Sequence, residues 1–104
     1  MLEIDKDSFA TEVEQSPVPV VIDFWGPQCG PCLALMPEVE ELAKSYQGRI
    51  TFCKLNVAGN RRLCIQLKVM SVPAFLFYKD GECKDRLMGD EVSIENIKAK
   101  ADNL

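Results

Sequence analysis

The spacing of hydrophobic residues changes several times along the chain, and each change predicts a different element. Residues 2–4 are predicted to form a short strand. A helix capped by Asp7 or Ser8 is predicted to follow and to run to about Gln15, because two apolar residues four positions apart share one helical face. Two prolines then prevent that helix from continuing.

Residues 18–25 are almost continuously apolar and β-branched, which is typical of a central strand covered on both faces. Asp23 is the one charged residue of that strand. From Cys29 the apolar residues recur at helical spacing until Gly48, and they predict an amphipathic helix of about 17 residues. Pro37 falls inside this helix and is expected to bend its axis.

In the rest of the chain, apolar runs are bounded by turn residues and polar caps. They predict a strand at residues 49–57, a short helix after Gly59-Asn60, strands at 74–78 and 82–88 joined by Asp80-Gly81, and a last helix capped by Ser93. The order of elements is βαβαβαββα, with parallel crossovers first and an antiparallel hairpin later. An α/β fold follows, in which a central mixed sheet of about five strands is flanked by four helices.

Composition limits the classes of function that need to be considered. The 104 residues, 47% of them hydrophobic, suffice for one buried core, so a single domain over residues 1–104 is expected. With 12 basic and 16 acidic residues and no basic run, nucleic acid and membrane are not expected as partners. The N-terminus has no pattern of an export signal, which predicts a cytoplasmic protein, and a monomer is expected at this size and charge.

Cys29 and Cys32 carry the chemistry, because they lie where the buried strand ends and the long helix begins. A sulfur at that point faces unpaired backbone N–H groups and the positive end of the helix dipole, which both favour the thiolate. Cys29 is therefore the expected nucleophile. Cys32, one helical turn later, is the expected resolving thiol, and Pro31 between them removes no helical hydrogen bond.

Two thiol–disulfide exchanges follow from this arrangement. The thiolate of Cys29 attacks a substrate disulfide, and Cys32 then attacks Cys29 and releases the reduced substrate. The second exchange requires Cys32 to lose its proton. Asp23 is the candidate acceptor, because strand alternation places it on an inner face, where burial is expected to raise the pKa of its carboxyl.

The motifs resemble those of the thioredoxin family over essentially the whole chain. They are Val-Ile-Asp-Phe-Trp ending at Trp25, Cys29-Gly30-Pro31-Cys32, Ser71-Val72-Pro73, and Gly89. The resemblance implies the thioredoxin fold and a protein-disulfide reductase without cofactor or metal. Its implied partners are disulfide-containing substrate proteins and a thioredoxin reductase.

The resemblance also implies roles for individual residues. Lys54 would neighbour the buried Asp23, and Pro73 would follow a cis peptide bond and face the cysteine pair. An apolar patch would dock substrates through Trp25, Gly30, Pro31, Val72, Pro73 and Gly89. Gln28 and Leu33 depart from the family pattern, which usually places tryptophan before the first cysteine and lysine after the second.

These departures leave two alternatives open: a binding module with this fold, or a more oxidising disulfide-exchange protein. A zinc site would need four ligands, but the chain has no histidine and its other cysteines are scattered. Those cysteines, Cys53, Cys64 and Cys83, are expected to act as small buried hydrophobes. Cys64 and Cys83 lie on a short helix and a hairpin strand, which makes them the candidates for reaching the surface.

Overall fold

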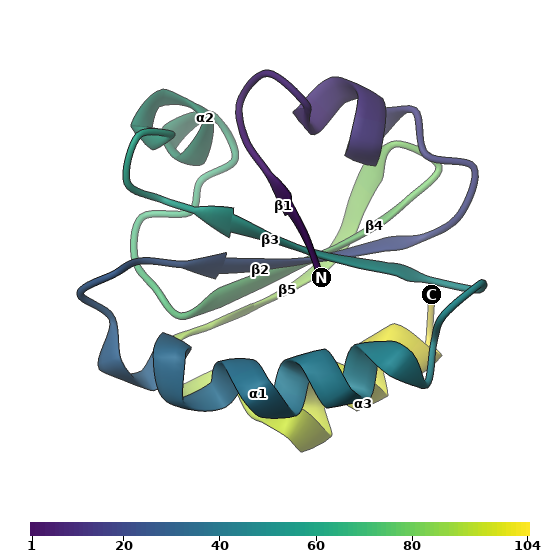
Figure 1. Ribbon diagram of the computed structural model, residues 1–104. Coiled ribbons are helices and arrows are strands. Elements are labelled where there is room, and N and C mark those ends of the chain that lie inside the picture. Colours follow the sequence, from purple (N-terminus) through teal and green to yellow (C-terminus); the bar gives the residue numbers. More distant parts are fainter.

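A five-stranded sheet forms the centre of the computed structural model, which describes the whole chain, residues 1–104 (Figure 1). Its strands, in spatial order, are β1 (Leu2–Ile4), β3 (Thr51–Asn56), β2 (Val20–Trp25), β4 (Ala74–Lys79) and β5 (Glu82–Met88). β1 and β2 both run parallel to β3, whereas β4 runs antiparallel to β2 and to β5. The predicted mixed sheet and the order of its elements are confirmed.

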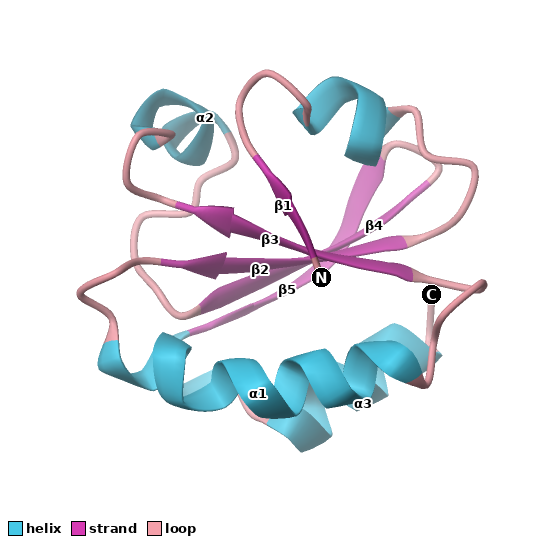
Figure 2. Ribbon diagram, in the orientation of Figure 1, coloured by secondary structure: helices cyan, strands magenta, loops and turns pink.

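Helices cover both faces of this sheet. α1 (Gly30–Lys44) and α3 (Ile94–Asp102) lie together on one face, and α2 (Arg61–Gln66) lies on the other with a short π-helix (Ala10–Glu14) (Figures 1 and 2). These are the four helices that the sequence predicted. A 3₁₀ turn at Gly89–Glu91 also follows β5. None of the helices has the length and apolar character needed to span a membrane.

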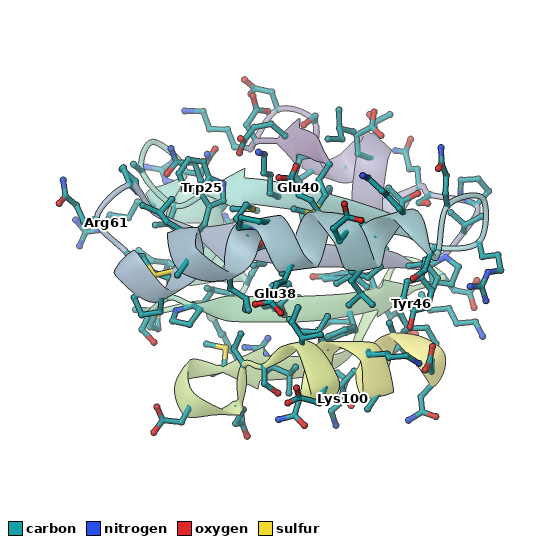
Figure 3. The ribbon with its side chains drawn as sticks, turned by 60° about the horizontal axis from the view of Figure 1, so that its bottom comes forward. Trp25, Glu38, Glu40, Tyr46, Arg61 and Lys100 are labelled. Atoms are coloured by element: carbon teal, nitrogen blue, oxygen red, sulfur yellow. A yellow bond between two sulfur atoms is a disulfide. The ribbon has the colours of Figure 1, made fainter.

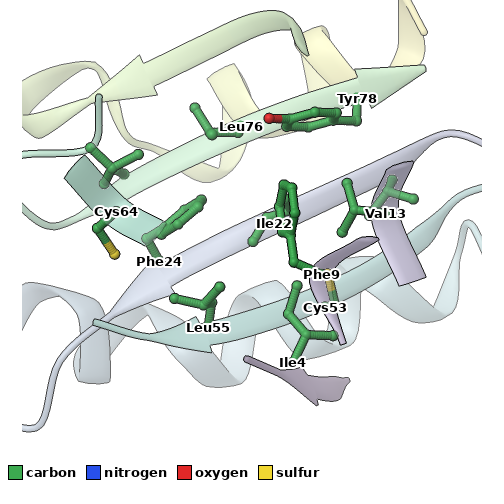
Figure 4. Packing of buried hydrophobic residues seen from close by; sticks show 13 residues of the cluster. Ile4, Phe9, Val13, Ile22, Phe24, Cys53, Leu55, Cys64, Leu76 and Tyr78 are labelled. Atoms are coloured by element: carbon green, nitrogen blue, oxygen red, sulfur yellow. The ribbon is translucent and has the colours of Figure 1, made fainter. Parts of the chain in front are cut away.

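β2 is the most deeply buried part of the fold, because its residues pack against helices on both sides. Val20, Ile22 and Phe24 belong to the hydrophobic core beneath α2 and the π-helix, which Figure 4 shows from close by. Val21 belongs to the second core, beneath α1 and α3. Asp23 points to that second face, since it pairs in register with a residue of the second core on β4.

The first helix differs from its prediction. Neither Asp7 nor Ser8 caps it; the carboxylate of Asp5 instead accepts hydrogen bonds from the N–H groups of Asp7 and Ser8, at 2.8 and 3.0 Å. The chain therefore makes a side-chain-stabilised turn first. The helical hydrogen bond that follows spans five residues, from the N–H of Gln15 to the carbonyl of Ala10.

Strand β2 begins at Val20 rather than at residue 18. The N–H of Val18 is taken by the hydroxyl of Ser16 at 3.2 Å, and Pro19 has no N–H to donate to a neighbouring strand. The later helices agree with the predictions more closely. Ser93 caps α3 by accepting from the N–H of Asn96 at 3.1 Å, and Pro37 lies inside α1.

The turn between β4 and β5 is tight and packs against the π-helix. Asp80 and Gly81 both have positive φ angles, 55° and 77°, as a two-residue hairpin turn of type I′ requires. A Cβ atom built on Gly81 would lie 2.9 Å from the carbonyl oxygen of Glu14. Glycine is favoured at this position, because the backbone angle strains other residues and the neighbouring carbonyl leaves no room for a Cβ atom.

We expect Gly81→Ala to destabilise the protein more than Gly48→Ala. Both glycines have positive φ, but a Cβ on Gly48 meets nothing within 4 Å. The Gly48 variant loses about 1 kcal/mol from backbone strain alone, whereas the Gly81 variant also has to displace a backbone carbonyl, which costs a further 1–3 kcal/mol or so. Urea unfolding of both variants measures the difference, and equal losses would contradict the packing of this turn.

Candidate active site

A disulfide bond joins Cys29 and Cys32, whose Cα atoms lie 5.3 Å apart. Cys29 is the N-cap of α1 and has an extended backbone, so its sulfur lies over the first turn. The backbone N–H of Cys32 donates to this sulfur at 3.2 Å. Cys29 is half-buried and Cys32 is only 3% exposed. The two sulfurs therefore differ in accessibility: a macromolecule can reach the first but not the second.

A shallow hollow of about 450 Å³ surrounds Cys29. Gly30 and Pro31 line it on one side, and Val72 lines it on another. The Val72–Pro73 peptide bond is cis, as the resemblance implied. Pro73 and Pro31 together line a second, smaller hollow.

Two residues of the expected docking patch, Gly89 and Trp25, line neither of these hollows. Gly89 lies beside Pro73, because its N–H donates to the Pro73 carbonyl at 3.0 Å. Trp25 ends β2 and is half-buried, but it lines neither of the two hollows. Its indole N–H donates instead to the carboxylate of Glu3 on β1, at 3.3 Å.

Asp23 is a buried carboxyl in the middle of the sheet, with 3% of its surface exposed. Burial raises its pKa from 3.8 to about 7. The positive charge of Lys54 opposes this rise, and the negative charges of Glu3 and Glu40 add to it. A pKa near neutrality lets the carboxyl accept and donate a proton at neutral pH.

The strand register explains why these charges act on one another. Glu3 on β1 pairs with Lys54 on β3, and Lys54 pairs with Asp23 on β2, so the three form one row across the sheet. Glu40 comes from α1, where its carboxylate also lies 3.5 Å from the N-terminal ammonium group. Figure 3 labels Glu40 on the same side of α1 as Trp25.

The sequence analysis missed Glu3 and Glu40. Strand alternation could have suggested Glu3, because it has the opposite orientation to the apolar residues on either side of it. Its distance from Asp23 depends on the pairing of β1 with β3, which no local pattern specifies. Glu40 looked like an ordinary solvent-facing residue of an amphipathic helix.

The remaining cysteines follow the predictions only in part. Cys53 and Cys64 are buried free thiols, so Cys64 does not reach the surface as suggested. Cys83 is exposed, which corrects the expectation that it is a buried hydrophobe; it lies on β5, at the edge of the sheet, between exposed charged residues. Burial raises the pKa of Cys53 to about 12.

Comparison with known proteins agrees with this architecture. The family model described as Thioredoxin matches residues 1–103. A thioredoxin of Acetoanaerobium sticklandii is 42% identical over 99 residues, which make up 95% of this chain and 94% of the relative. The chain belongs to the thioredoxin family. A thioredoxin of Peptoclostridium acidaminophilum is 41% identical over 99 residues, covering 95% of this chain and 90% of the relative.

A chloroplastic M-type thioredoxin of Spinacia oleracea is 40% identical over 87 residues, which cover 84% of this chain and 48% of the relative. Thioredoxins are protein-disulfide oxidoreductases, and this chain has the redox-active pair of cysteines that such an activity requires. The predicted thioredoxin fold and the thiol–disulfide oxidoreductase class are thereby confirmed. Partners of this chain include disulfide-containing substrate proteins.

We expect Asp23→Asn to stabilise the oxidised protein above neutral pH. In the folded chain the carboxyl keeps its proton until about pH 7, whereas in the unfolded chain it ionises near pH 3.8, so wild-type stability falls as pH rises between these values. The difference between the two pKa values corresponds to about 4 kcal/mol. Urea unfolding at pH 5 and pH 8 captures about 3 kcal/mol of this difference, because the pH-dependent loss ends near pH 7 and part of it already occurs below pH 5. The surface variant Glu38→Gln serves as control. An Asn variant with the wild-type pH dependence would contradict this interpretation.

We expect two variants to shift the pKa of Asp23 in opposite directions. Lys54→Met removes the attracting charge and raises this pKa further, whereas Glu3→Gln removes a repelling charge and lowers it. The Gln side chain still offers an oxygen to the indole of Trp25, so the hydrogen bond remains possible. Carbon-13 NMR of the Asp23 carboxyl across a pH titration reports both shifts. Shifts in the same direction would show that the two residues act through packing rather than charge.

Proposed function

We propose that this chain reduces disulfide bonds of other proteins, with Cys29 as the nucleophile and Cys32 as the resolving thiol. The observation that carries the proposal is the asymmetry of the pair: Cys29 is half-buried at the start of α1, and Cys32 is buried within the first turn of the helix. An incoming disulfide can contact only the first sulfur.

The first exchange begins from the reduced form. The thiolate of Cys29 attacks one sulfur of the substrate disulfide, a mixed disulfide forms, and the second substrate sulfur leaves as a thiolate. The helix dipole and the N–H of Cys32, which lies 3.2 Å from the Cys29 sulfur, both favour the ionised nucleophile.

The second exchange releases the substrate. Cys32 loses its proton and attacks Cys29, the intramolecular disulfide forms, and the remaining substrate sulfur leaves. Two electrons have then moved from the chain to the substrate. We assign Asp23 as the acceptor of the Cys32 proton, because its pKa of about 7 suits proton transfer at neutral pH. Lys54 acts on this step through its charge.

We assign substrate docking to the surface formed by Trp25, Gly30, Pro31, Val72, Pro73 and Gly89. The hollow at Cys29 and the hydrogen bond between Gly89 and Pro73 support this assignment, since they bring segments distant in sequence to one place. Val72, which lines this hollow, lies outside any helix or strand, so an extended substrate can form hydrogen bonds with its backbone N–H and C=O groups.

We further propose that a thioredoxin reductase regenerates the dithiol, and that the chain works as a cytoplasmic monomer. Three cysteines remain as free thiols, a state that a reducing compartment maintains. Gly30 and Pro31 between the cysteines, with no histidine there, support the reducing direction of electron flow over the oxidising one.

Cys29→Ser is expected to reduce insulin cleavage with dithiothreitol to the uncatalysed rate, because no exposed nucleophile of the pair remains. Cys32→Ser is expected to accumulate a stable mixed disulfide with the substrate, because the resolving thiol is missing. Cys83→Ser, at the exposed free cysteine, serves as the control and keeps wild-type turnover. Insulin turbidity and mass spectrometry measure these outcomes. Full activity of Cys29→Ser would end the proposal.

A further inference from the structure

An apolar groove continues from the hollow at Cys29 towards α2. A third hollow, of about 490 Å³, adjoins the hollow at Cys29, and the two share Val57, Ala58 and Val72 as lining residues. The far part of this groove exposes large apolar side chains to solvent: Ile65 is 49% exposed and Met70 is 73% exposed. Exposed apolar surface that is continuous with a reactive sulfur is typical of a binding site for a polypeptide.

The charge of this groove is opposite to that of the chain as a whole. Arg61 lines the third hollow and Arg62 follows it in sequence, while no acidic residue lines the third hollow or the hollow at Cys29. The chain carries 16 acidic residues against 12 basic ones. Neither arginine takes part in an ion pair within the chain. Figure 3 shows Arg61 reaching outward at the end of the molecule where Trp25 lies.

The position of these arginines is unfavourable for the helix itself. Both lie in the first turn of α2, which contains no acidic residue, and a cation there opposes the helix dipole. Neither guanidinium donates a hydrogen bond to the rest of the chain. Because the charges do not stabilise the local structure, a role in binding explains them better than a role in folding.

We propose that the groove holds an acidic, extended segment of the substrate protein on one side of its reactive cysteine. An apolar substrate side chain packs against Ile65 and Met70, and a nearby Asp or Glu pairs with Arg61. This inference rests on the proposed disulfide reduction and specifies the class of substrate that the site prefers. The positive charge of the groove also attracts the acidic segment, and this attraction weakens as ionic strength rises.

Two disulfide-linked peptides that differ only in charge test the inference. Both have an apolar residue near the cysteine, followed by two Glu in one peptide and two Lys in the other. We expect the reduced wild-type protein to cleave the acidic peptide about fivefold faster, measured as kcat/KM, and salt to diminish this preference. Arg61→Glu is expected to abolish or reverse it.

Two control variants separate charge from packing. Lys79→Glu changes a charge by the same amount on an exposed residue at the other end of the sheet, and is expected to keep the preference. Met70→Gln is expected to lower kcat/KM for both peptides by a similar factor, because it removes apolar contact but no charge. Equal cleavage of the two peptides by the wild-type protein would overturn the inference.

The neutral disulfide of 2-mercaptoethanol distinguishes this failure from a failure of the proposed function, because it is too small to occupy the groove. If the wild-type protein and Arg61→Glu reduce this small disulfide at the same rate, but the wild type shows no preference between the peptides, the disulfide reduction stands and the preference for acidic substrates is contradicted. If the wild-type protein reduces neither the two peptides nor this small disulfide, the proposed function itself is contradicted.

Discussion

Burial of β2 on both faces is the constraint on which the rest of the structure depends. The strand lies in the middle of the sheet, and Val20 to Phe24 are all buried, so its direction and register are fixed by two cores at once. Cys29 comes four residues after the end of this strand and starts α1. The short connection leaves the first turn of α1 little freedom, and Cys29 takes its position from the strand.

The same burial sets the electrostatics of the site. A carboxyl in the middle of a fully covered strand loses its hydration, and this is the largest cause of the raised pKa of Asp23. Lys54, its register neighbour on β3, only partly offsets this loss. The sheet therefore holds the buried carboxyl and the helix holds the sulfurs, and α1 packs against the face to which Asp23 points.

Local features were readable from the sequence, and features set by strand pairing were not. The Asp80-Gly81 turn and the Ser93 cap depend on neighbouring residues and were predicted correctly. The cap of the first helix was predicted wrongly, because Asp5 accepts from the N–H groups of Asp7 and Ser8 and forms a turn before the helix. The cysteine pair is a local motif as well. The influence of Glu3 on Asp23, by contrast, requires residues of three strands to align in one row.

The closeness of the two cysteines also limits how long a substrate stays attached. In the proposed mechanism, the thiol that displaces a substrate sulfur from Cys29 belongs to the same helical turn and needs no diffusion to arrive. Its effective concentration far exceeds that of any thiol in solution. The covalent complex is therefore short-lived by construction, and the protein can act on many partners in succession without being sequestered by any of them.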